Sequence, residues 1–237
     1  MSSLQIKPSP SLTDPGTLPS LHSGDRLNQP TFHRLYEATP EGFKAELIEG
    51  TVYVASPVSP GHSRSHVKIM AWLANYWEAT PGTDLLVDAT FVLDDANEPQ
   101  PDAALLLEPA LGGRAREEGN KIVGPPDLAV EVSYSSWAVD LSDKLRAYEA
   151  AGVREYLVID VHAKAIHWFI SNGGRFEPIV AGEGGLLRSS TFPGLWIDPS
   201  IFFDAKIGRV LAALKLGLAS PEHAAFVAKL DATGGAV

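Results

Sequence analysis

The sequence predicts a mixed α/β fold with one central sheet, because a single amphipathic helix separates two buried strands. Residues 127–133 are an apolar run that follows a Gly-Pro-Pro turn, and residues 156–159 are a second apolar run. Between them, residues 141–151 have apolar side chains at helical spacing. One helix that crosses over between two strands usually joins parallel strands, so we expect these two strands to be parallel.

The N-terminal part predicts a tail, a short helix, a hairpin and a longer helix. Residues 1–29 are rich in Ser and Pro and have no apolar period, which predicts a mobile tail. Residues 31–39 predict a short helix, and residues 46–54 predict two strands that turn at Glu49-Gly50. Residues 60–79 predict an amphipathic helix. Its expected buried stripe consists of Val67, Met70, Ala71, Ala74 and Trp77.

The remaining elements follow from the same patterns. Further apolar runs predict strands over residues 85–93, 103–107 and 165–170. A polar loop is expected through residue 121. Asp140 is expected to cap the helix over 141–151, and Gly152 to end it. Residues beyond 204 predict one or two C-terminal helices, which could pack a homodimer.

Composition excludes several classes of protein. Hydrophobic residues make up 45% of the 237 residues and charged residues 20%, as in an ordinary globular protein. No run approaches the roughly 18 apolar residues of a membrane span, and no secretory signal is visible, so we expect a cytoplasmic protein without a membrane partner. The absence of cysteine excludes disulfides and thiolate zinc sites. The net charge of −10 argues against a nonspecific nucleic-acid coat, but not against an enzyme that gathers carboxylates around a metal.

Glu131 is the first residue that suggests chemistry, since it lies in a strand where valine would be expected. Side chains alternate along a strand, so Glu131 shares a face with Ala129 and Ser133. A buried carboxylate without a partner costs several kcal/mol by roughly any estimate. We therefore expect a cation next to Glu131.

Lys144 and Asp102 are the candidates to form a site together with Glu131. Lys144 lies on or beside the buried face of the predicted helix, from which its amine could reach Glu131 or extend to solvent. Asp102 follows Pro101 at the start of the strand over 103–107, where Pro-Asp is also a common turn pair. Two carboxylates at strand ends suit Mg²⁺ or Mn²⁺, which share such sites with phosphate oxygens.

With these residues, the chain resembles the PD-(D/E)XK nuclease superfamily, and more narrowly its bacterial Uma-type branch, described as restriction endonucleases. The matching segments are ELIEG at 46–50, SPVSPGH at 56–62, PD at 101–102, LAVEVSYSS at 128–136, DLSDKLRAYEAAGVREYLVID at 140–160 and FPGLWID at 192–198. The resemblance as a whole covers roughly residues 30–203. The resemblance implies a restriction-endonuclease-like mixed sheet flanked by helices, with an extra β-hairpin region. The tail over 1–29 and a helical extension over 204–237 lie outside it.

The resemblance also implies a metal-dependent endonuclease that hydrolyses phosphodiester bonds, with DNA as the expected partner. Asp102 and Glu131 would hold Mg²⁺ or Mn²⁺. The superfamily lysine usually lies two residues after the glutamate, where this chain has Ser133, and the branch implies that Lys144 replaces it. Glu46 aligns with an acidic residue that the branch places near the metal.

Other functions remain open at this point. In a noncatalytic module of the same fold, which would bind nucleic acid or protein, Lys144 would only neutralise Glu131 in a buried ion pair. His62 and His66 have the spacing of a zinc-binding helix, but Ser63 replaces the glutamate of that motif and no third ligand is evident. The chain has no G-x-S-x-G elbow, which argues against a serine hydrolase. A pair of glycosidase carboxylates is supported by residue type alone.

Overall fold

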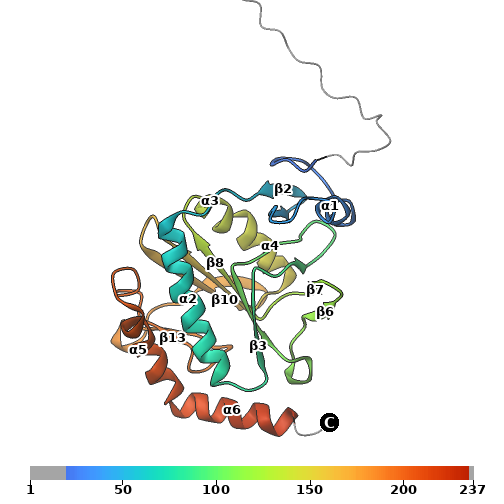
Figure 1. Cartoon of the computed structure of the whole chain (residues 1–237). Coiled ribbons are helices and arrows are strands. Elements are labelled where there is room, and N and C mark those ends of the chain that lie inside the picture. Colours follow the sequence, from blue (N-terminus) through green and yellow to red (C-terminus); the bar gives the residue numbers. More distant parts are fainter. Residues whose placement is uncertain (1–19, 235–237) are drawn as a thin grey trace, which may run out of the picture.

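A six-stranded mixed sheet runs through the centre of the molecule in the computed structural model, which describes residues 20–234 (Figure 1). Its strands, in spatial order, are β11 (Arg175–Pro178), β10 (Ala165–Asn172), β9 (Glu155–Asp160), β8 (Leu128–Ser133), β5 (Ala103–Leu107) and β3 (Thr83–Val87). All neighbours pair antiparallel except β8 and β9, which are parallel. The parallel pair confirms the prediction from the crossover helix.

Helices cover both faces of this sheet. They are α2 (Pro60–Glu78), α3 (Trp137–Asp140), α4 (Asp143–Ala151), α5 (Ile207–Leu218) and α6 (Pro221–Gly234), whereas α1 (Gln29–Tyr36) packs in a separate cluster with Leu47 and Val52. Val130 of β8 belongs to a core cluster with Leu73 of α2 and Leu214 of α5, whereas Ala129 packs in another cluster with Tyr148 of α4. Successive β8 side chains therefore point to opposite helix layers, and Glu131 faces the α4 layer.

Smaller sheets and short helices surround the central sheet. They are the hairpin of β1 (Ala45–Ile48) and β2 (Thr51–Val54), the sheet of β4 (Phe91–Val92), β7 (Lys121–Val123) and β6 (Arg116–Glu118), the pair β12 (Leu187–Arg188) and β13 (Trp196–Ile197), and the 3-10 turns η1 (Pro109–Leu111) and η2 (Glu183–Gly185). The predicted polar loop through residue 121 is thus partly wrong, because a hairpin that turns at Gly119 forms β6 and β7. The hairpin β1–β2 is the one expected around Glu49-Gly50.

The start of the described chain packs on this hairpin. Leu21 is buried, and Arg26 forms a β-bridge with Thr51. Residues 20–28, which the sequence assigned to the tail, therefore belong to the folded body, while residues 1–19 of that tail lie outside the described residues.

The predicted buried stripe of α2 is partly wrong: Met70 packs against the main core, but the two ends of the stripe do not. Val67 and Trp77 are 60% and 44% exposed. The buried side chains are Ser65, Ile69, Trp72, Leu73 and Tyr76. Trp72 and Tyr76 can be buried because Trp72 Nε1 donates to the carbonyl of Trp196 and the Tyr76 hydroxyl donates to the carbonyl of Pro193.

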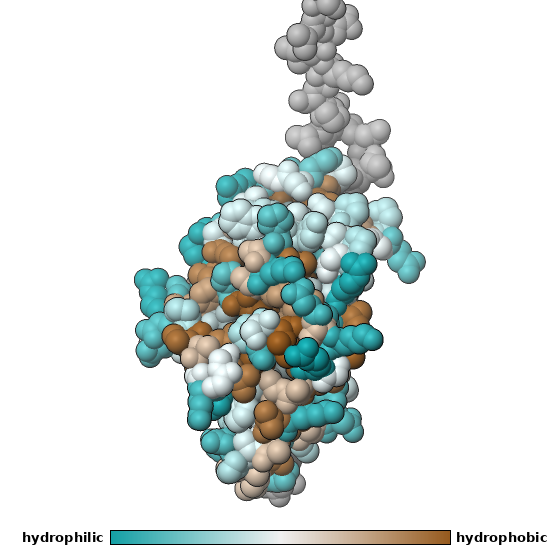
Figure 2. All heavy atoms as spheres, turned by 90° about the vertical axis from the view of Figure 1, so that its left-hand side faces the viewer, coloured by the Kyte–Doolittle hydropathy of each residue, from teal (hydrophilic) through white to brown (hydrophobic). Residues whose placement is uncertain are grey.

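The side of the molecule to the left in Figure 1 carries apolar residues among hydrophilic ones (Figure 2).

The two C-terminal helices complete the main core. Val210 and Leu214 of α5 and Leu230 of α6 are buried in the same cluster as Val130 of β8. Within residues 20–234 no single helix has the length and apolarity to cross a membrane. Helices α5 and α6 meet those criteria only as a pair, and a 66° bend separates them.

Candidate active site

Asp102 and Glu131 lie side by side at one edge of the central sheet. Ala103 of β5 is paired with Val130 of the antiparallel strand β8, so the residue before Ala103 and the residue after Val130 adjoin. The backbone N–H of Val132 donates to Asp102 Oδ2 at 2.6 Å. The carboxylates from two separate segments thus reach the same end of neighbouring strands, as the sequence predicted.

Lys144 reaches this edge from α4. Its Nζ lies 3.0 Å from Glu131 Oε1, 2.8 Å from Glu46 Oε2 and 3.8 Å from Asp140 Oδ1. Only 6% of the lysine side chain is exposed, so its amine does not extend to solvent. One ammonium therefore lies among three carboxylates, which come from β1, β8 and α3.

Asp140 and Tyr148 complete this cluster, and sequence reasoning missed both. Tyr148 donates its hydroxyl to Glu131 Oε1 at 3.0 Å. Asp140 does not cap the helix over 141–151, because α3 ends at Asp140 and α4 begins at Asp143. The Asp140 carboxylate is instead buried and accepts a hydrogen bond from Ser136. Asp140, Lys144 and Tyr148 are spaced four residues apart, a helical period that could have revealed them.

The excess of carboxylates sets the protonation of the cluster. Burial raises the pKa of Glu131 well above its usual range; Lys144 opposes this shift, and the neighbouring carboxylates of Glu46 and Asp140 add to it. Burial alone would lower the pKa of Lys144, but Glu131, Glu46 and Asp140 outweigh it and raise that pKa well above its usual range. Lys144 therefore keeps its positive charge, and Glu131 binds a proton more readily than an ordinary glutamate does.

A second set of contacts fixes Glu46 relative to Lys144. Tyr53 of β2 donates its hydroxyl to Asp143 Oδ2 at 2.7 Å, and Arg146 of α4 forms two hydrogen bonds with Glu49 at the turn of the β1–β2 hairpin. These contacts tie the hairpin that carries Glu46 to the helix that carries Lys144. The N–H of Gln100 also donates to Glu46 Oε1 at 2.7 Å.

Removal of the Asp143 charge is expected to release Tyr53. The hydrogen bond to Asp143 raises the pKa of Tyr53 from 10.0 to about 12, and burial adds to the shift. A raised pKa means that this stabilisation is fully present below pH 10 and is lost as the pH rises toward 12. In Asp143→Asn, we expect the pKa of Tyr53 to fall toward 10.0 and the alkaline loss of stability to become less steep.

The pKa of Tyr53 is measurable by phenolate absorbance in a difference titration against Tyr53→Phe. Asp204→Asn is the control, because that exposed carboxylate pairs with Lys164 instead of a tyrosine. An unchanged tyrosine titration in Asp143→Asn would show that the contact does not form in solution.

On the other side of Asp102, two histidines of α2 approach its second oxygen. His62 Nε2 lies 3.5 Å and His66 Nε2 3.8 Å from Asp102 Oδ1. The contact with Asp102 raises the pKa of His62, against the effect of burial. Burial alone would raise the pKa of Asp102, but His62 and the Val132 N–H outweigh it and lower that pKa. Asp102 is therefore ionised, as a metal ligand must be.

The donor set at this edge fits a divalent ion. Asp102 and Glu131 present hard carboxylate oxygens of the kind that Mg²⁺ and Mn²⁺ prefer. In addition, ligand atoms of His66, Asp88 and Asp102 all lie within 4.8 Å of one another. Both groupings share Asp102.

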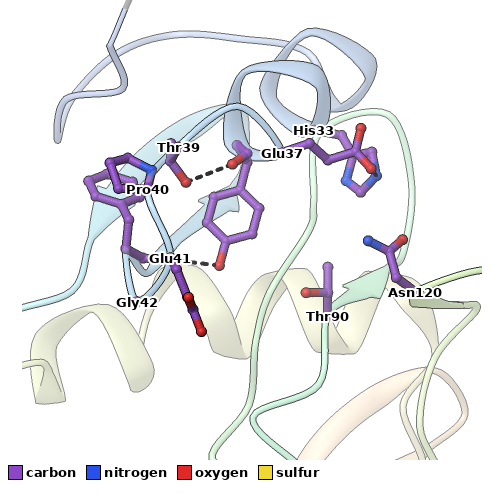
Figure 3. A pocket seen from close by; sticks show the side chains of 10 residues that line it. His33, Glu37, Thr39, Pro40, Glu41, Gly42, Thr90 and Asn120 are labelled. Atoms are coloured by element: carbon purple, nitrogen blue, oxygen red, sulfur yellow. Dashed lines mark hydrogen bonds and ion pairs between the residues drawn. The ribbon is translucent and has the colours of Figure 1, made fainter.

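A pocket of about 240 Å³ lies beside α1 (Figure 3). His33 and Thr90 line it, and the Tyr36 hydroxyl donates to the carbonyl of Phe43 in its wall. Gln100 connects this wall to the cluster, because its side-chain amide donates to Tyr36 and Thr90 while its N–H donates to Glu46. Gln100 thus helps to hold Glu46 in position, while none of the predicted site residues lines the pocket.

The mixed sheet, with Asp102 and Glu131 at the ends of two central strands, places the protein in the class of restriction-endonuclease-like folds. Residues 29–200 match the Uma2 family model, described as "Putative restriction endonuclease", and the chain belongs to this family. The family resemblance seen in the sequence is thereby confirmed.

One solved structure shows the same fold. It is described as a "putative nuclease belonging to DUF820" from Anabaena variabilis; the match has a TM-score of 0.54 and 14% identity, and covers 76% of this chain and 97% of that one. No similar protein was found among curated proteins.

Proposed function

We propose that this protein is a divalent-metal-dependent endonuclease that hydrolyses phosphodiester bonds. The observation that carries the proposal is the meeting of Asp102, Glu131 and Lys144 at one end of the central strands. The description of the family as "Putative restriction endonuclease" supports it. These three residues would be catalytic together with Glu46. We further expect DNA as the substrate and a homodimer that presents one site to each strand.

Asp102 and Glu131 would hold Mg²⁺ or Mn²⁺, which when bound lowers the pKa of a water and neutralises charge on the phosphate. The Val132 N–H keeps one oxygen of Asp102 in place, and the Tyr148 hydroxyl does the same for Glu131. Lys144 offsets negative charge that grows on the phosphate, a contribution of about 3 kcal/mol for a well-placed donor. Glu46 holds the Lys144 ammonium in position through their 2.8 Å contact.

A cleavage assay tests this proposal. The full chain is incubated with single-stranded DNA, double-stranded DNA and RNA, each with Mg²⁺, with Mn²⁺ or with a chelator. We expect cleavage of DNA that requires one of the two ions. Cleavage that persists in the chelator would contradict metal dependence, and cleavage of RNA alone would contradict the DNA substrate.

One observation favours a second candidate, a noncatalytic module that binds nucleic acid. Lys144 pairs with Glu131 and Glu46 in the structure, and such a buried pair needs no metal. Under this alternative no substrate is cleaved with either ion, and the chain binds nucleic acid with a Kd that the chelator leaves unchanged. The same samples therefore separate the two functions.

A further inference from the structure

The fold places carboxylates beside two histidines of α2 that have no such neighbours in the sequence. His62 and His66 lie one turn apart with stacked rings, 5.9 Å between centroids. The sequence offers no third ligand near them. The structure brings Asp102 from the start of β5 and Asp88 from the segment after β3 to the same place.

We propose that His66, Asp88 and Asp102 form a binding site for a divalent first-row transition-metal ion. One ligand atom from each residue lies within 4.8 Å of the other two. Ligands bonded to such an ion at about 2.1 Å can be at most about 4.2 Å apart. The side chains therefore have to rotate toward one another to close the group around an ion.

The site lies on the α2 side of Asp102. Asp102 Oδ2 is held by the Val132 N–H, and Oδ1 is the oxygen that lies 3.8 Å from His66 Nε2. Glu131 Oε1, by contrast, accepts hydrogen bonds from Lys144 and Tyr148 of the α4 layer. The proposed ion thus shares only Asp102 with the proposed nuclease site, and its binding does not depend on cleavage.

The ligand chemistry selects the ion. An imidazole nitrogen favours Mn²⁺, Co²⁺, Ni²⁺ or Zn²⁺ over Mg²⁺, which binds oxygen almost exclusively. Solvent reaches the ligands, because the side chains of His66 and Asp88 are 25% and 43% exposed. Lys44 Nζ lies 2.9 Å from Asp88 Oδ2 and marks the place where a cation is attracted; its own side chain is half exposed and can move away.

Co²⁺ is the probe for this site, since its visible absorption changes when protein ligands replace bound water. The full chain is titrated with Co²⁺ and binding is read from that absorption, without substrate. We expect His66→Gln to weaken binding by at least about 10-fold, which is the smallest loss typical even of residues that only support a ligand. Asp88→Asn should weaken it as well. His162→Gln, in an exposed turn, is the matched control and should bind as the unaltered protein does.

Co²⁺ binding by His66→Gln that equals that of the unaltered protein would overturn the proposal, and so would displacement of Co²⁺ by an equal concentration of Mg²⁺. Circular dichroism confirms that each variant is folded, and Asp88→Asn, at an exposed side chain, provides the same test if His66→Gln does not fold. Glu131→Gln should retain Co²⁺ binding whether or not it cleaves DNA. Loss of binding in that variant would place the ion at Glu131 instead and also overturn the proposal.

Discussion

Glu131→Gln is expected to abolish metal-dependent cleavage, with a loss of roughly 1,000-fold or more in kcat. Glutamine has the same shape and keeps an oxygen that can accept from Tyr148, but it has no charge to hold a divalent ion. The change also removes one of the three carboxylates around Lys144, so the excess of negative charge in the cluster becomes smaller. The loss of activity should therefore occur in a folded protein, which thermal melting would verify.

Glu155→Gln is the matched control for this experiment. Glu155 is also a buried carboxylate on the central sheet, but it pairs with Leu128 at the opposite end of β8 and accepts hydrogen bonds from Ser189. We expect this variant to retain kcat even if its melting temperature falls. If Glu131→Gln cleaved DNA at the rate of Glu155→Gln, the proposed metal ligand and the nuclease assignment built on it would both fail.

Lys144→Met is expected to lower the free energy of unfolding by about 3–5 kcal/mol, the usual cost of removing one partner from a buried ionic group. Methionine fills a similar volume, so the loss is electrostatic: Glu131, Glu46 and Asp140 would face one another without a counter-charge. Acidification should reduce the loss, because protonated carboxylates need no cation. Urea denaturation of both proteins at two pH values measures the effect.

Two further variants make the Lys144 result decisive. Lys164→Met removes a lysine whose partner Asp204 is exposed, and it should change stability little. The double variant Lys144→Met/Glu131→Gln should recover part of the lost stability, since one repelling charge is gone. An equal loss in the Lys144 and Lys164 variants would mean that the buried cluster is not ionised in solution.

The sequence alone predicted the strands of the central sheet except β11, and it singled out Asp102, Glu131 and Lys144 as the polar residues of interest. The alternation of Leu128 to Ser133 and the single crossover helix predicted two parallel buried strands, because strand and helix periods are local properties of the chain. Glu131 was visible because a carboxylate in an apolar strand needs a partner. Asp102 could be suggested because it precedes the strand over 103–107, and Lys144 because it lies on or beside the buried face of the predicted helix.

Only the tertiary structure decided how these groups pair. The sequence could not distinguish a solvent-exposed Lys144 from a buried one, since that depends on the β1–β2 hairpin that covers α4 and brings Glu46 to it. For the same reason the apolar stripe of α2 was assigned partly to the wrong face, because buried Trp72 and Tyr76 depend on carbonyl acceptors more than a hundred residues away. Asp88 and Asp102 meet His66 only in the fold. Local pattern fixes elements, whereas the partners of a buried charge are set by segments distant in the chain.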